Sequence, residues 1–234
     1  MEKNFGVLPS GEEAGLYTIS CGGVTAGITD YGAALVSLLV PDSVGNLAAV
    51  VLGSDACAGH ANGDGCPGAT VGRSANRIQG AAFRLGSRDC CLTPNENGNN
   101  LHSGPDFYFK RLWKLISHTD TEVVLELHSP HGDQGFPGNA EIRVTYSLDA
   151  SGGLHIVYDG ICDQDTVFNL TNHSYFNLRG HEHTDAAMEQ VLTLPGRFFT
   201  PADAENIPTG EKRSVEGTPM DFRVPKPISR DLRQ

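Results

Sequence analysis

The chain has 234 residues, 39% of them hydrophobic, which suits one large domain or at most two small ones with a sizeable core. Its formal net charge is −11, from 28 acidic and 17 basic residues. Nucleic acid and anionic membranes attract clustered Lys and Arg, so neither is expected as the main partner. A neutral or small polar ligand fits this balance better.

Targeting and redox signals are few. No apolar run approaches the ~18 residues that a transmembrane helix needs, and the first residues do not predict a signal peptide. The six cysteines form no CxxC pair, and Cys90 directly precedes Cys91, which suits neither a disulfide framework nor a zinc site. We therefore predict reduced thiols in a cytoplasmic protein.

Alternating apolar and polar residues predict strands along much of the chain. Residues 33–40 and 48–52 form apolar runs of strand length, and 121–127 is a further candidate. At 140–148 the apolar side chains occupy the even positions, so a strand there buries one face and exposes the other. The same pattern resumes at 154–158 after a Gly-rich turn, which indicates a hairpin.

Turn residues are frequent between these runs. With 28 Gly and 13 Pro, few stretches can hold a helix of three turns, and 185–190 is one short candidate. Short strands with regular turns predict an all-β fold, a sandwich or a barrel. No internal repeat or shift in composition marks a boundary, so we expect a single domain over residues 1–234.

Four segments hold more polar residues and glycine than strands require: 68–83, 99–113, 131–138 and 166–178. Asn76 and Arg77 fit a turn with an ion-pairing surface arginine as well as a ligand site. His102 equally fits a loop histidine satisfied by the backbone, and the glycines and proline of 135–138 suit a turn.

The fourth segment is harder to explain by structure alone. Seven polar side chains from Asn169 to Asn177 stand beside apolar ones, and a purely structural strand has to satisfy many buried donors and acceptors. Convergent hydrogen-bonding groups beside aromatic rings suit a sugar site.

These segments resemble one known family. The stretch NLTNHSYFNL at 169–178 closely resembles a signature of the aldose 1-epimerase family. GRSANRI at 72–78, NLHSG at 100–104 and DQGFPG at 133–138 resemble its other blocks in the same order, followed by TGE at 209–211 and GTPMDFR at 217–223. Several blocks in one order are far more specific than any one of them.

The resemblance implies a large antiparallel β-sandwich, the galactose mutarotase-like supersandwich, with few short helices. It also implies cofactor-free interconversion of the α and β anomers of free aldoses such as galactose and glucose. That reaction opens the hemiacetal: a base removes the C1 hydroxyl proton while an acid protonates the ring oxygen. Histidine suits the acid role because its pKa lies near neutral pH.

By the family pattern His173 is the acid. His102 is implied as the second catalytic histidine, which binds the sugar and supports charge on the ring oxygen. Asn76 and Arg77 correspond to ligands of the sugar hydroxyls. Ser174 and Tyr175 border the same pocket.

The resemblance further implies a continuation past Gln234 that carries a sugar-binding aspartate and the glutamate base. Neither has a counterpart here, because Asp221 and Glu211 belong to other motifs, so we expect these 234 residues to lack the general base. Losing a general base typically removes about 10²–10⁴-fold of rate.

Two alternatives stay open. The chain is a carbohydrate-binding protein without turnover, or a hexose-phosphate epimerase in which Arg73 and Arg111 are the nearby candidates for the phosphate. The histidines at 181 and 183 lack a third placed ligand, so we predict no metal. The sequence leaves the oligomeric state and the preferred aldose undetermined.

Overall fold

A computed structural model describes residues 2–54, 56–62 and 67–231. The chain forms two compact units, Met1–Tyr175 and Phe176–Gln234, which are described separately below. The single domain expected over residues 1–234 stays a prediction.

The first unit begins with a five-stranded antiparallel sheet in the order β1-β2-β3-β4-β5. Its strands are β1 (Glu2–Val7), β2 (Glu13–Cys21), β3 (Val24–Thr29), β4 (Ala34–Pro41) and β5 (Leu47–Ala49). The run at 33–40 accordingly lies almost wholly in β4. The run at 48–52 only begins in a strand, because β5 ends at Ala49 and the buried Val50 and Val51 follow it.

A second antiparallel sheet has the order β11-β12-β13-β14. Its strands are β11 (Lys114–His118), β12 (Glu122–Ser129), β13 (Ala140–Leu148) and β14 (Leu154–Cys162). The alternation predicted in β13 is confirmed: Ile142, Val144 and Tyr146 are fully buried, whereas Arg143 between them is exposed. The predicted hairpin is also confirmed, because β13 pairs with β14 in register from Leu148 opposite Leu154.

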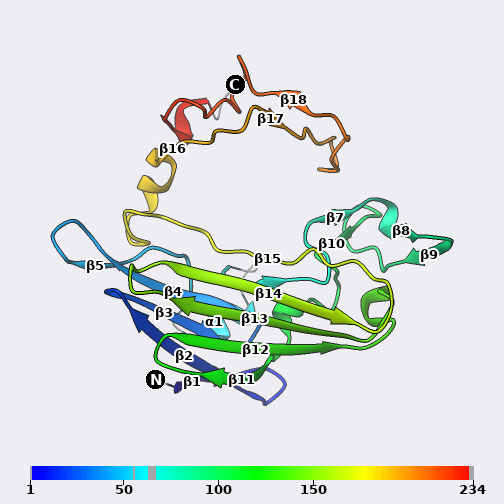
Figure 1. The fold of residues 1–234 in the computed structure, drawn as a ribbon, viewed down its shortest axis with the longest axis horizontal. Coiled ribbons are helices and arrows are strands. Elements are labelled where there is room, and N and C mark those ends of the chain that lie inside the picture. Colours follow the sequence, from blue (N-terminus) through cyan, green and yellow to red (C-terminus); the bar gives the residue numbers. More distant parts are fainter. Residues whose placement is uncertain (1, 55, 63–66, 232–234) are drawn as a thin grey trace. The chain divides into compact units, whose positions relative to one another are not determined.

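These two sheets pack face to face (Figure 1, blue and green strands). Their inner faces share one core that includes Ile19 and Ile28 from the first sheet and Leu125 and Val144 from the second. Burying such a side chain fully stabilises the fold by about 1.5–3 kcal/mol. The antiparallel β-sandwich predicted from the sequence is confirmed.

Short elements connect and flank the sandwich. They are α1 (Cys57–Asn62), β6 (Thr70–Val71), β7 (Arg77–Ile78), β8 (Ala82–Leu85), β9 (Arg88–Cys91), β10 (Asn100–Leu101) and β15 (Thr171–Asn172), with 3₁₀ turns at Gln79–Ala81, Tyr108–Lys110 and Asp133–Gly135. β8 pairs with β9, β10 with β7 and β15 with β6, all antiparallel. The last two pairs carry most of the polar segments found in the sequence.

The second unit contains two small antiparallel pairs, β16 with β19 and β17 with β18. Their bounds are β16 (Val191–Leu192), β17 (Phe198–Phe199), β18 (Arg213–Ser214) and β19 (Lys226–Pro227). The short helix predicted at 185–190 is a 3₁₀ helix at Thr184–Glu189, and another covers Ile228–Asp231.

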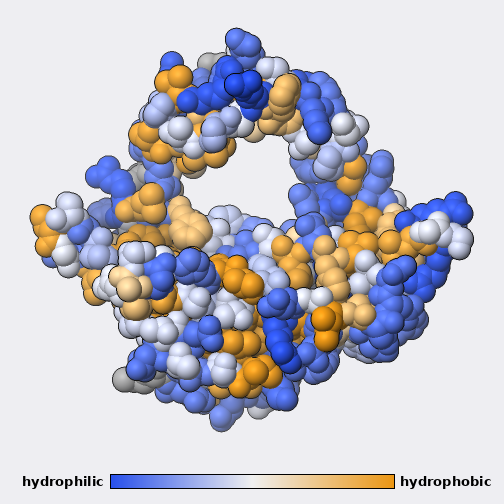
Figure 2. All heavy atoms as spheres, viewed as in Figure 1, coloured by the Kyte–Doolittle hydropathy of each residue, from blue (hydrophilic) through white to orange (hydrophobic). Residues whose placement is uncertain are grey.

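Five cysteines are free thiols, and the sixth, Cys66, lies outside the described residues. Across the part of the chain that the structure describes, none of the helices is both long and apolar enough to cross a membrane. The face shown in Figure 2 mixes hydrophilic residues with hydrophobic patches. In the sandwich, Val157 and Ile161 of β14 are 50% and 67% exposed.

Candidate active site

Two short strand pairs bring three of the four polar segments together. In the pair β7–β10, Arg77 lies opposite Leu101, which places His102 beside Asn76. In the pair β15–β6, Thr171 lies opposite Val71, and the chain on either side stays bonded to the same segment. The His173 N–H donates to the Ala69 carbonyl (3.0 Å), and the Ala75 N–H donates to the Asn169 carbonyl (2.7 Å).

His102 is held in one orientation by the backbone of Asn76. Its own N–H donates to the Asn76 carbonyl (2.9 Å), and its Nδ1 accepts the Asn76 N–H (3.0 Å). The positive φ of His102 (55°) and of Asn76 (61°) turns the two residues toward this reciprocal contact. Because Nδ1 is an acceptor, the ring proton of the neutral imidazole sits on Nε2.

The electrostatic surroundings of His102 keep it neutral. Burial, together with the nearby His173 and Arg77, lowers the pKa of His102 to about 4, against a smaller opposite effect of Glu96. A second proton also has no good position, since Nδ1–H and the Asn76 N–H would face each other. At neutral pH His102 is therefore a hydrogen-bond donor through Nε2 and not a cation.

His173 lies next to His102 in an edge-to-face arrangement. The two ring centroids are 5.7 Å apart and the ring planes form an angle of 84°. The His173 ring centroid also lies 5.1 Å from that of Tyr175, which is 49% exposed. Two imidazoles and one phenol thus form a continuous half-exposed row.

Arg77 is anchored by a carboxylate that the sequence analysis did not single out. Its Nε and Nη2 donate to the two oxygens of Glu96 at 2.5 and 2.9 Å, and its Nη1 donates to the Asn76 Oδ1 at 3.1 Å. The ion-pairing arginine considered for this position is therefore present. This ion pair does not exclude a ligand role for Arg77, because the pair lies close to His102.

Ser174 and Asn172 differ in what they contact. The Ser174 N–H donates to Asn172 Oδ1 (3.0 Å), while the Ser174 Oγ is buried and has no hydrogen-bond partner among the described residues. Asn172 Nδ2 donates to the Gly68 carbonyl (2.7 Å) and to the Tyr146 hydroxyl (3.2 Å). Asn172 thus ties the signature segment to the sandwich core.

Arg73 has a structural role. It is completely buried, and its guanidinium donates to the Ser129 Oγ (2.6 Å), the Pro137 carbonyl (2.7 Å) and the Thr166 Oγ1 (3.0 Å). Arg111, the other arginine considered for a phosphate, donates to both oxygens of Asp133 (2.8 Å each). Arg73 is therefore not a candidate for binding a phosphate, because its N–H donors are already engaged inside the protein.

Sequence reasoning missed Glu96 because its surroundings, Pro-Asn-Glu-Asn-Gly at 94–98, have the composition of an ordinary turn. The sequence spacing could not indicate the Arg77–Glu96 contact either, because Glu96 lies 19 positions after Arg77 and two strands come between them. The polar block at 99–104 that follows directly was the one available indication.

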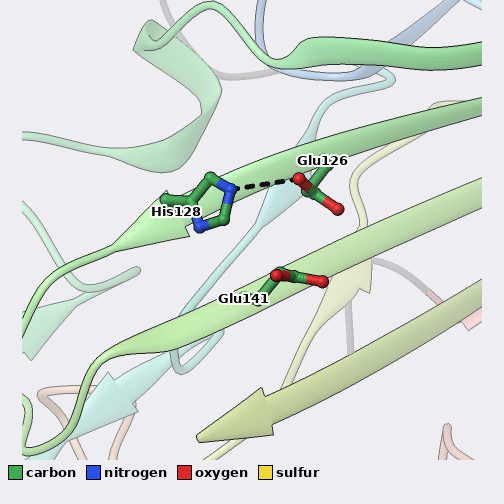
Figure 3. Close-up of side chains that lie close together, drawn as sticks. All are labelled: Glu126, His128 and Glu141. Carbon is green, nitrogen blue, oxygen red and sulfur yellow. Dashed lines mark hydrogen bonds and ion pairs between the residues drawn. The ribbon is translucent and has the colours of Figure 1, made fainter.

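A second polar cluster lies elsewhere on the sandwich, where Glu126, His128 and Glu141 bring their ligand atoms within 4.8 Å of one another (Figure 3). The cation at this cluster is a guanidinium: Arg143 contacts Glu126 at 2.6 Å and Glu141 at 2.8 Å. His128 also bonds Glu126 at 3.0 Å. We interpret the cluster as a cross-strand ion-pair network between β12 and β13.

The family assignment follows from comparison with known proteins. The model of the aldose 1-epimerase family matches residues 15–234. The chain belongs to the aldose 1-epimerase family.

Named relatives agree with this assignment. The chain is 44% identical to an aldose 1-epimerase of Haemophilus influenzae over 167 residues, 71% of this chain and 49% of that protein. It is 34% identical to the aldose 1-epimerase of Escherichia coli over 96% of this chain and 64% of that protein. It is 35% identical to the galactose mutarotase of Homo sapiens over 97% of this chain and 66% of that protein. The chain thus spans from about half to about two thirds of the length of these relatives.

Solved structures of the aldose 1-epimerase family share the fold. A GalM/aldose epimerase homologue from C. elegans superimposes with a TM-score of 0.87 at 34% identity, over 92% of this chain and 66% of that one. A galactose 1-epimerase from Lactobacillus acidophilus gives a TM-score of 0.85 at 25% identity, over 98% and 67%. The mutarotase-like fold predicted from the sequence is confirmed.

Proposed function

We propose that this protein is an aldose 1-epimerase that interconverts the α and β anomers of a free hexose. The observation that carries the proposal is the neutral His102 beside His173, with Arg77 close to His102. Membership of the aldose 1-epimerase family and the names of the relatives support it.

The geometry supports different roles for the two histidines. Ring opening requires a proton to be delivered to the ring oxygen as the bond between that oxygen and C1 breaks, leaving a C1 aldehyde. His102 is a poor proton donor because its Nδ1 already accepts the Asn76 N–H, although its Nε2–H can stabilise charge on the ring oxygen. His173 is therefore the proton donor.

The remaining steps complete the anomer exchange. After rotation about the C1–C2 bond, the C5 hydroxyl attacks either face of the aldehyde and returns its proton to His173. The Tyr175 ring beside His173 offers an apolar face for the sugar. The C1 hydroxyl releases its proton to solvent water as the ring opens, and the C1 oxygen takes a proton back from water as the ring closes.

The substrate is proposed to be a free sugar and not a sugar phosphate. The two arginines considered for a phosphate are engaged, Arg73 inside the protein and Arg111 with Asp133. We keep the cytoplasm as the proposed compartment, in line with the five free thiols.

The test is polarimetry with freshly dissolved α-galactose, following rotation above the rate of the buffer alone. The variant His173→Asn should lose about 10²–10⁴-fold in kcat, the usual contribution of a general acid. The control His128→Asn changes a histidine that is 65% exposed on another part of the sandwich, and should keep the parent rate.

Full activity of His173→Asn would overturn the assignment of the acid. If the parent protein binds galactose in calorimetry but does not accelerate mutarotation, the alternative of a carbohydrate-binding protein without turnover is correct instead.

A further inference from the structure

We propose that Glu96 is a positioning residue, which fixes the guanidinium of Arg77 so that two of its N–H groups face bound sugar hydroxyls. This inference rests on the proposed function, because it assigns Glu96 to the sugar site described above.

The donor inventory of Arg77 gives the first argument. A guanidinium has five N–H groups. Two donate to the Glu96 carboxylate from Nε and Nη2, and one donates to Asn76 Oδ1 from Nη1. One N–H on each terminal nitrogen is left, and the two nitrogens are neighbours. They can donate together to two oxygens of one ligand, as a fixed fork does.

The carboxylate is itself held by a rigid turn. The Asn99 N–H donates to the Glu96 carbonyl (2.8 Å) and the Glu96 N–H to the Asn99 carbonyl (3.2 Å). The Asn95 side chain accepts the Leu101 N–H (2.6 Å) and donates to the Leu101 carbonyl (2.9 Å). Glu96 is therefore fixed to the strand that leads into His102.

This fixation matters because arginine is long and flexible. Ordering a free arginine side chain on binding costs conformational entropy. A carboxylate that has already ordered the side chain removes this cost before the sugar arrives. The partial exposure of both side chains, 19% for Arg77 and 30% for Glu96, leaves the pair accessible to a ligand.

Charge gives the second argument. The hydrogen bonds from Arg77 lower the pKa of Glu96, so the carboxylate is ionised and balances the guanidinium. Glu96 also raises the pKa of His102, whereas Arg77 and His173 lower it. Without Glu96, an unbalanced cation would lie beside the imidazoles.

The experiment compares Glu96→Gln with the parent protein in the galactose assay. Gln keeps the size of the side chain but loses the charge and one acceptor oxygen, so Arg77 becomes mobile. Arg77 contacts the sugar before and during ring opening, so the loss should appear mainly as a KM about tenfold higher, with kcat changed less than threefold.

A matched control uses another Arg–Glu pair of the same geometry. Glu211 accepts from Arg213 Nε (2.9 Å) and Nη2 (2.7 Å) in the second unit. Glu211→Gln should leave KM unchanged.

A double-mutant cycle separates positioning from a merely structural role. If Glu96 acts through Arg77, then Glu96→Gln should add less than twofold to the KM of an Arg77→Lys variant. The same tenfold increase in both backgrounds would overturn the proposal, as would an unchanged KM for Glu96→Gln.

Two readouts are independent of turnover. The ¹⁵N–¹H signal of the Arg77 Nε should be slow to exchange in the parent protein and lost in Glu96→Gln, and galactose affinity in calorimetry should fall about tenfold. If the parent protein binds galactose but shows no mutarotation, the proposed function fails while these readouts still decide the role of Glu96. A retained signal with unchanged affinity would overturn that role.

Discussion

Replacing the buried Arg73 tests whether this cation holds the sandwich to the loop at 133–138. Its guanidinium is fully buried and makes short contacts to the Ser129 Oγ and the Pro137 carbonyl, with longer ones to Gly138 and to the Tyr108 hydroxyl (3.3 Å). The Phe136 ring lies 5.6 Å away. Arg73→Met keeps much of the volume but removes every one of these donors.

The expected cost follows from the acceptors that are left behind. Each buried carbonyl without a donor costs about 1–3 kcal/mol, and the backbone oxygens of Ser129, Pro137 and Gly138 all lose theirs. The variant also avoids the desolvation cost of burying a guanidinium, which offsets part of the cost of the unpaired carbonyls. We expect a net loss of about 3–5 kcal/mol in the free energy of unfolding, the cost of three unpaired carbonyls reduced by that offset.

Urea unfolding followed by tryptophan fluorescence measures this loss in the first unit alone. The protein has one tryptophan, Trp113, which is buried in the sandwich core and donates to the Tyr108 carbonyl. The control Arg84→Met removes an exposed side chain with one long ion pair (3.7 Å) and one exposed hydrogen bond to the Gly86 carbonyl (3.2 Å), and should cost less than about 0.5 kcal/mol. A loss below 1 kcal/mol for Arg73→Met would refute the reasoning.

Three further predictions use the same unfolding assay. The pKa of His102 is about 4 in the folded protein and about 6.5 when unfolded. The unfolded chain therefore binds the extra proton, and stability should fall as pH drops from about 6.5 to 4, less steeply in His102→Gln. Tyr146→Phe removes a buried hydroxyl that donates to a backbone carbonyl at 2.8 Å, and should cost about 1–2 kcal/mol. Gly68→Ala should cost clearly more than the roughly 1–2 kcal/mol of Gly86→Ala. Both glycines have positive φ, but only at Gly68 would a Cβ overlap a backbone oxygen, that of Leu35; equal losses would contradict this.

The strands of the sandwich could be predicted from the sequence because their signal is local. The even positions of 140–148 alternate with polar ones, and burial of one face alone produces that alternation. The same holds for the hairpin that follows, where turn residues fix the register. The motif blocks likewise indicated the family before any contact was known.

The site could be predicted only in part. The sequence analysis singled out Asn76, Arg77, His102 and His173, and the structure places the two imidazoles 5.7 Å apart with Arg77 alongside. Their catalytic and binding roles stay predictions. No local pattern indicated that His102 is locked neutral by the Asn76 backbone, since that contact depends on two strands pairing.

The sequence by itself determined the alternating strands, the turns between them and the polar blocks, because each of these is a property of neighbouring residues. Tertiary structure alone decided which arginine is buried and which one remains accessible. Arg73 and Arg77 lie four residues apart in one motif, yet the first is enclosed by the loop at 133–138 and the second pairs with Glu96 at the surface. A charged side chain takes the role that its partners impose, and those partners come from distant parts of the chain.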